Sequence, residues 1–380
     1  MLMSLILLWH VVNEAGSLLF HEDNEMALGL LLFAQQMPTS QQNWKIKHVL
    51  KHDSGVTAMA MSPDGREVAA GGILSPVVSM WDVEKGTLIR QLQGLKGSAQ
   101  AISYSPDGRF FAAGRGMVGP DDTCVYVFKA GTDNILQRLQ PPKITTPFAP
   151  KGVSVVESLQ YSPDSQSLAV GFNQGAIGIY DATTGKLKKT ISISFHLHGS
   201  VAYSPNGKYL AFGERKKDEE ELLDHYVIQI LDVERGGISK TLSGHSDLIT
   251  SLAFAPNGKS LASATRTGTS RGMLDRKSNQ FVRKLNEDPI RIWDIETGAL
   301  VKELAGHTSS VMSLAFYQGG QYLVSGGHDK TIKIWDVARG ELVTTVTGHN
   351  GLIESVAVSQ DGRRLVSGGT EYVKIWERQP

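Results

Sequence analysis

Short runs of alternating apolar and polar residues recur along most of the chain, and this alternation is typical of half-buried β-strands. In one example, Ile249, Leu252 and Phe254 precede a polar stretch and Leu261-Ala262-Ser263 follows it. The polar stretch reads Ala255-Pro256-Asn257-Gly258. Proline presets φ, asparagine bonds its own backbone and glycine adopts a positive φ, so this stretch favours a tight turn. The pattern therefore predicts two antiparallel strands joined by a hairpin.

The same turn, flanked by apolar runs on both sides, occurs seven times along the chain. The spacing has a base period near 42 residues, lengthened by three insertions. A repeated period of this length indicates an architecture in which each copy contributes one structural unit. The copies of the turn begin at Ser62, Ser105, Ser162, Ser204, Ala255, Tyr317 and Ser359.

Two further markers stand at fixed places in the period. A Gly-His pair precedes the first strand at Gly244-His245, Gly306-His307 and Gly348-His349, with Lys51-His52 as a partial match. A Trp-Asp pair ends the third strand at Trp81-Asp82, Trp293-Asp294 and Trp335-Asp336, with weaker forms at Phe128-Lys129, Tyr180-Asp181, Leu231-Asp232 and Trp376-Glu377. Phased in this way over residues 44–377, the markers resemble the WD-repeat family. The resemblance implies an all-β fold, a single seven-bladed WD-repeat β-propeller.

The two ends of the repeat region predict how the ring closes. The chain ends just after the strand that reaches Trp376, which is the third strand of the last copy. One additional strand, residues 44–50, precedes the first copy. We expect this strand to be the fourth strand of the last blade, because closure removes exposed strand edges. The predicted propeller domain therefore covers residues 44–380.

Residues 1–43 form an apolar, irregular leader. Its two apolar runs, residues 1–12 and 27–34, are each shorter than the roughly 20 residues of a membrane-spanning helix. Neither run has the basic start and small-residue cleavage site of a good signal peptide. We therefore favour a disordered leader and a cytoplasmic protein, with export through this segment as the alternative.

Composition narrows the classes of partner and chemistry. Lys+Arg 38 balances Asp+Glu 38, which gives no general attraction to nucleic acid or to anionic membranes. The single cysteine, Cys124, excludes an intramolecular disulfide. The sequence contains no Gly-rich phosphate loop, no paired-cysteine motif and no Gly-x-Ser-x-Gly elbow. We expect no cofactor, other proteins as partners, and a monomer.

The resemblance also implies that a His, a Ser or Thr, a Trp and an acidic residue form one hydrogen-bonded network inside a blade. The best match is His307, Ser325, Asp329 and Trp335. The fifth copy offers His245, Ser263 and Trp293, with Glu287 or Asp288 as the acid, and the last copy offers His349, Ser367 and Trp376, with Glu371 as the acid. The first four copies place Ala70, Ala113, Val170 and Phe212 at the serine position, so the network is absent or partial there.

Asp, His and Ser together also resemble a catalytic triad. We reject that interpretation because the pattern repeats around the ring. A serine Oγ that accepts a hydrogen bond from a tryptophan Nε1–H inside a blade is not an exposed nucleophile. The expected role of these residues is to satisfy polar groups buried between strands.

The insertions are confined to two kinds of link. The Ser-Pro-Asp-Gly hairpins and the links after Trp-Asp stay short. The extra length lies between second and third strands and before one first strand. Because antiparallel strands alternate in direction, these two kinds of link emerge on the same rim of the ring, which predicts one elaborated face for partner binding. The lengthened links are residues 73–76, 115–123, 214–226, 266–289 and 140–152.

The largest insert, residues 266–289, combines cations with apolar residues, as docking surfaces do. The candidate partner-binding residues on this rim are Phe148, Arg271, Arg276, Phe281 and Arg283, because arginine and aromatic side chains dominate interface energetics. Two alternatives remain open. The insert folds back over its own blade, or its cations bind a small ligand or nucleic acid.

His196 and His198 are two residues apart, so on a strand both would point toward one possible metal. Zinc usually needs three or four ligands and the sequence shows no third, so a polar rim of the central channel is the favoured interpretation. The function that the resemblance implies is a protein–protein interaction scaffold rather than an enzyme. An active site in the central channel is the remaining alternative.

Overall fold

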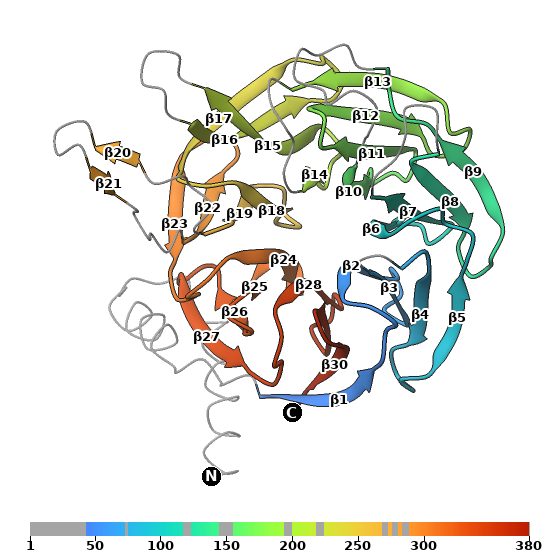
Figure 1. Cartoon of the computed structure of the whole chain (residues 1–380). Helices are drawn as coiled ribbons and strands as arrows, with labels where there is room; N and C mark the ends of the chain where they lie inside the picture. Colours follow the sequence, from blue (N-terminus) through green and yellow to red (C-terminus); the bar gives the residue numbers. More distant parts are fainter. Residues whose placement is uncertain are drawn as a thin grey trace, which may run out of the picture. The chain divides into compact units, whose positions relative to one another are not determined.

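The computed structural model describes residues 43–379 except 73–74, 117–122, 144–154, 194–199, 218–223, 268–272, 276–279 and 283–288. The leader interpretation of residues 1–43, and with it the export alternative, lies outside the described residues apart from Asn43. In the described part, seven four-stranded antiparallel sheets follow one another around a ring (Figure 1). The predicted seven-bladed β-propeller is confirmed.

The first four blades each run outward through four consecutive strands. Blade 1 comprises β2 (Val56–Met61), β3 (Glu67–Gly72), β4 (Val78–Asp82) and β5 (Leu88–Leu92). Blade 2 comprises β6 (Ala99–Tyr104), β7 (Phe110–Arg115), β8 (Val125–Lys129) and β9 (Ile135–Leu139). Blade 3 comprises β10 (Val156–Tyr161), β11 (Ser167–Phe172), β12 (Ala176–Asp181) and β13 (Leu187–Ser192). Blade 4 comprises β14 (Val201–Tyr203), β15 (Tyr209–Lys217), β16 (Asp224–Asp232) and β17 (Ile238–His245).

The last three blades complete the ring. Blade 5 comprises β18 (Ile249–Phe254), β19 (Ser260–Thr265), β22 (Ile290–Asp294) and β23 (Leu300–Leu304). Its long insert contains a separate hairpin of β20 (Met273–Asp275) and β21 (Gln280–Val282). Blade 6 comprises β24 (Val311–Tyr317), the 3-10 turn η1 (Gln318–Gly320), β25 (Tyr322–Gly327), β26 (Ile332–Asp336) and β27 (Glu341–Val346). Blade 7 comprises β28 (Ile353–Val358), β29 (Arg364–Gly369), β30 (Val373–Arg378) and β1 (Trp44–Leu50).

The closing strand pairs as the sequence predicts. Strand β1 runs antiparallel to β30, from Trp44 opposite Arg378 to Leu50 opposite Val373. Ionic contacts then tie this blade to blade 1. Arg364 Nη2 lies 2.7 Å from Glu84 Oε2, and Lys47 donates to the same carboxylate. These hydrogen bonds from Lys47 and Arg364 lower the pKa of Glu84 to about 2. Glu84 follows β4, so the closure joins two blades as well as two chain ends.

The core lies between neighbouring blades, where second and third strands bury apolar side chains. Phe111, Leu168, Leu261 and Leu323 on second strands are at most 1% exposed. Burial of their apolar surface stabilises the ring by roughly 25 cal/mol for each Å² removed from water. Each blade therefore depends on its neighbours for a complete core, which makes the closed ring one folding unit.

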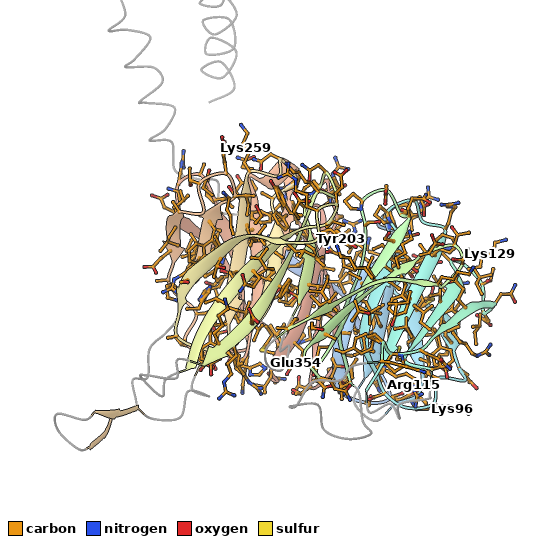
Figure 2. The ribbon with its side chains drawn as sticks, turned by 90° about the horizontal axis from the view of Figure 1, so that it is seen from above. Lys96, Arg115, Lys129, Tyr203, Lys259 and Glu354 are labelled. Carbon is orange, nitrogen blue, oxygen red and sulfur yellow. The ribbon has the colours of Figure 1, made fainter. Side chains whose placement is uncertain are left out.

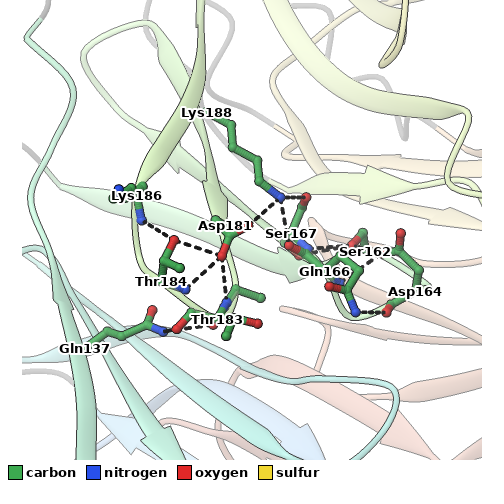
Figure 3. A network of polar contacts seen from close by, with 11 residues as sticks. Gln137, Ser162, Asp164, Gln166, Ser167, Asp181, Thr183, Thr184, Lys186 and Lys188 are labelled. Atoms are coloured by element: carbon green, nitrogen blue, oxygen red, sulfur yellow. Dashed lines mark hydrogen bonds and ion pairs between the residues drawn. The ribbon is translucent and has the colours of Figure 1, made fainter.

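The tight turns owe their uniform length to side chains that bond the backbone. In blade 3, Ser162 Oγ donates to Asp164 Oδ1 at 2.5 Å and accepts from the Ser167 N–H at 2.9 Å (Figure 3). After β12, Asp181 Oδ1 accepts from the Thr183 and Thr184 N–H groups at 3.1 and 2.8 Å (Figure 3). A residue inserted into either turn would break these bonds, so both links stay short.

The two faces of the ring differ as the insertions predict. Figure 2 places Lys96, Arg115 and Glu354 on one side of the ring, together with hairpin β20–β21, and Lys259 on the other. We call the first the elaborated face and the second the plain face. Between second and third strands, the links on the elaborated face span 73–77, 116–124, 173–175, 218–223, 266–289, 328–331 and 370–372. The described Ser-Pro-Asp-Gly-type hairpins on the plain face span 62–66, 105–109, 162–166, 204–208, 255–259 and 359–363.

One predicted link is wrong in part. Residues 214–226 are predicted to form a loop, but β15 and β16 continue into this segment and pair from Gly213 opposite Ile228 to Lys217 opposite Asp224. The reason is a chain of polar side chains that begins with the buried Glu214 and Gln229. Gln229 Nε2 donates to Glu214 Oε2 at 2.6 Å, and Thr241 Oγ1 donates to Gln229 Oε1 at 2.7 Å. A charged residue therefore continues the strand within the segment predicted as a lengthened link.

Candidate functional site

The His–Ser–Trp networks form in the three blades for which they were predicted. In blade 6, His307 Nε2 lies 2.7 Å from Ser325 Oγ, and Trp335 Nε1 donates to the same oxygen at 2.8 Å. The corresponding distances are both 2.7 Å in blades 5 and 7. The central serines, Ser263, Ser325 and Ser367, are 0% exposed. Each serine oxygen is thus committed to two buried partners and is closed to a substrate.

The group that faces histidine Nδ1 differs among the three blades. In blade 6 it is the expected acid, because His307 Nδ1 lies 2.7 Å from Asp329 Oδ2. Burial alone would raise the pKa of Asp329, but hydrogen bonds from His307 and Thr331 outweigh it and hold the pKa at about 2. In blade 5, Arg291 Nη1 lies 3.0 Å from His245 Nδ1. The proposed acids of that blade, Glu287 and Asp288, lie outside the described residues.

Blade 7 lacks the predicted acid contact within the described structure. No hydrogen bond joins Glu371 to His349, and Glu371 Oε2 is buried without a hydrogen-bond partner in the described residues. Burial, reinforced by the charge of Lys374, lowers the pKa of His349 to about 4. His349 is therefore a neutral histidine at physiological pH, which suits a hydrogen-bonding role in the core.

Blade 1 holds an incomplete version of the same network. His52 and Trp81 have ring centroids 6.1 Å apart, close to the 6.2 Å between His307 and Trp335. Ala70 takes the serine position, as the strand register shows, and His52 Nε2 is buried without a partner in the described structure. Of the three network residues, His, Ser and Trp, blade 1 therefore lacks only the serine.

The predicted partner-binding residues fall largely outside the described structure. Phe148, Arg271, Arg276 and Arg283 are in undescribed segments, as are His196 and His198 of the metal hypothesis. Phe281 lies in β21, where its backbone pairs opposite Leu274 of β20. The insert thus places a two-stranded hairpin on the elaborated face, next to no other strand of the described sheets.

A further feature of the elaborated face was not predicted. The innermost strand of six blades carries a β-bulge at the same position, near the start of the strand, and each bulged residue is partly exposed. Bulges redirect a side chain away from the strand ladder. We call this set the bulge ring, and it consists of Thr57, Gln100, Glu157, Thr250, Met312 and Glu354.

Most polar members of the bulge ring have a partner from a neighbouring blade. Thr57 Oγ1 donates to the Ala99 carbonyl at 3.2 Å, and Thr250 Oγ1 donates to the Val311 carbonyl at 2.5 Å. Glu354 Oε1 lies 3.0 Å from His328 Nε2. Glu157 stands apart, because burial raises its pKa to about 7 against the opposing charge of Arg266.

The described residues also bear on metal binding and on membrane insertion. No group of three or more His, Cys, Asp or Glu residues there is arranged to hold a metal ion. Among the same residues, no helix is both long and apolar enough to cross a membrane.

Comparison with known proteins identifies the class to which this propeller belongs. The model "WD domain, G-beta repeat" matches residues 44–82, 236–271, 298–336 and 340–377. A second model, "Anaphase-promoting complex subunit 4 WD40 domain", matches residues 122–198, and the two together span more than half of the chain. The chain belongs to the WD-repeat family, as the phased Gly-His and Trp-Asp markers indicated.

Relatives with the same repeats extend the comparison. The chain is 28% identical to nuclear distribution protein PAC1 of Coccidioides posadasii over 296 residues, which cover 75% of this chain and 58% of that protein. It is 26% identical to nuclear distribution protein nudF of Aspergillus niger over 78% of this chain and 61% of that protein. It is 25% identical to the periodic tryptophan protein 2 homolog of Dictyostelium discoideum over 76% of this chain and 27% of that protein. The chain therefore spans about three fifths of the length of the nuclear distribution relatives.

Proposed function

We propose that the protein is a protein-interaction scaffold that holds its partners on the elaborated face. The observation that carries the proposal is the difference between the two faces of one ring. Side-chain hydrogen bonds keep the plain-face turns at minimal length, whereas links on the elaborated face extend up to residues 266–289 with their own hairpin. Variable loops on a rigid scaffold are where binding functions usually lie. Membership of the WD-repeat family supports the same role.

The protein acts without catalysis of its own under this proposal. The residues that resemble a triad are occupied, because Ser325 Oγ bonds both His307 and Trp335 inside the blade. A nucleophile must instead reach a bound substrate while its base takes the proton. The networks therefore stabilise the blades, and binding falls to the loops.

The insert 266–289 is the proposed main contact, with Arg271, Arg276, Phe281 and Arg283 as anchors and Phe148 as an apolar neighbour on another link. Arginine and aromatic residues combine large contact areas with directed polar groups. The alternative function is binding of nucleic acid or a small anionic ligand by the cations of this insert. That alternative would show a steep loss of affinity with added salt.

The test shortens the insert and measures partner capture by the full chain. The variant keeps Arg266 and Thr267 and replaces the remaining link with one as long as residues 328–331. The ring should stay folded, because loop length changes stability only slowly, and capture of partner proteins should fall sharply. The matched control carries Lys85→Glu and Lys186→Glu on the plain face and should capture normally. Unchanged capture by the shortened chain, or salt-sensitive RNA capture in place of proteins, would contradict the proposal.

A further inference from the structure

The bulge ring contains one carboxylate whose surroundings differ from those of its counterpart. Glu157 in blade 3 and Glu354 in blade 7 occupy the same bulge position. Glu354 is paired with His328, which follows the second strand of the preceding blade. No residue of the described structure donates a hydrogen bond to Glu157. The charge of Arg266 favours the ionised form of Glu157, but the two side chains form no ion pair in the described structure.

The reason for this difference is a glycine. The backbone N–H of His328 donates to the Ser310 carbonyl at 2.8 Å, and the N–H of Gly116 donates to the Ser98 carbonyl at 3.0 Å. These equivalent bonds place Gly116 in blade 2 where His328 stands in blade 6. Glycine has no side chain to offer, so Glu157 lacks in blade 2 the kind of partner that His328 of blade 6 gives to Glu354. The amide of Gln100 lies beside the same glycine, with Nε2 2.6 Å from where a Cβ would stand.

An unpaired, half-buried carboxylate is costly to the fold. Burial disfavours the charged form, and a structural carboxylate normally recovers that cost by pairing. In the described structure, Glu157 has no hydrogen-bond or ion-pair partner that offsets this cost. Carboxylates held in this way are typical of sites whose partner arrives from outside. The side chain is partly exposed and near the elaborated face, so an external group can reach it.

We propose that Glu157 and the bulge residues around it form a recognition site for the guanidinium group of an arginine side chain on a partner protein. A guanidinium matches the site better than an ammonium, because it is weakly hydrated and donates two parallel N–H bonds to one carboxylate. The inference rests on the proposed function only in that both use the elaborated face.

Two peptides that differ in charge but hardly in shape test the site. The probes are the labelled peptides Ala-Ala-Arg-Ala-Ala and its citrulline counterpart, each capped at both ends, and the measurement is fluorescence anisotropy with the full chain. The arginine peptide should bind at least about tenfold more tightly than the citrulline peptide, the expected size for a charged hydrogen bond. Glu157→Gln should remove that preference, and Glu296→Gln on the plain face should keep it. Equal affinity for the two peptides, or no binding of either at millimolar concentration, would overturn the proposal.

A melting measurement separates recognition from a structural role. If Glu157 is held for a ligand, Glu157→Gln should raise the Tm at pH 8 while it weakens arginine binding. Arg266→Ala should strengthen peptide binding, because it removes a competing cation. A lower Tm for both variants would mean that the two residues serve the fold, and would contradict the proposal. The shortened-insert variant should still bind the arginine peptide, so loss of protein capture there tests the proposed function alone.

Discussion

At the scale of single residues, one buried serine oxygen organises each complete network. Ser325 accepts from Trp335 and bonds His307, and Asp329 fixes the far side of the ring of His307. His307→Ala leaves the serine and the aspartate without this partner. We expect a loss of about 1–3 kcal/mol in the free energy of unfolding, the usual cost of an unsatisfied buried group. Urea denaturation would measure it, and partner binding by the folded fraction should persist. An activity lost with unchanged stability would instead favour catalysis.

The incomplete network of blade 1 makes the opposite prediction. Ala70→Ser should place a hydroxyl between His52 and Trp81, whose rings already have the spacing seen in blade 6. A gain of about 1 kcal/mol is expected, the net contribution of an average intramolecular hydrogen bond. Ala69→Ser is the matched control, since Ala69 is the adjacent buried alanine on the other face of β3 and its hydroxyl should destabilise. If both variants lose stability equally, the serine position does not act as described.

The pKa of Glu157 predicts how stability changes with pH. The folded-state pKa of about 7 exceeds the ordinary value of 4.5, so the fold favours the protonated acid. Its contribution is fully present below pH 4.5 and is lost as pH rises through 7. Glu157→Gln should therefore be more stable than the parent at pH 8, by on the order of 2–3 kcal/mol, and nearly equal to it at pH 4. A difference independent of pH would show that the carboxylate is not the cause.

At the scale of elements, the strands could be predicted wherever a turn and an apolar alternation coincide. Strand β1 was identified by counting, because seven copies leave one blade short of a fourth strand. The extension of β15 and β16 could not be predicted, since the repeat spacing shows the extra length but not the bond between Gln229 and Glu214 inside it. The bulge ring was also missed. A bulge is a property of backbone pairing, and no single residue type is common to the six residues of the bulge ring.

Deletion of β1 tests the closure of the ring. Removal of residues 44–50 should expose the edge of β30 and eliminate the contacts of Lys47 with Glu84. We expect a lower melting temperature and concentration-dependent association, because unpaired edges recruit other strands. Deletion of the seven residues that precede β1, 37–43, is the size-matched control. A monomeric protein with the parental melting temperature after loss of β1 would show that the strand does not close the ring.

At the scale of the whole molecule, the WD-repeat ring presents two unlike surfaces. The phased markers predicted the ring and its elaborated face, because repeats and insertions are visible in sequence. The anchors on the insert could not be tested in the same way, since Arg271, Arg276 and Arg283 lie outside the described residues. Their assignment depends on residue type and on the face to which the insert belongs, and it stays a prediction.

Cross-linking of captured complexes would show directly whether partners bind on the elaborated face. Exposed lysines mark both faces. Figure 2 shows Lys96 on the elaborated face and Lys129 and Lys259 on the plain face. Lys330 lies in the link 328–331 of the elaborated face. Mass spectrometry of the complexes formed by the intact chain would count intermolecular cross-links at each lysine. We expect links from partners to Lys96 and Lys330 and few to the plain face. Links concentrated at Lys129 and Lys259 would contradict this prediction.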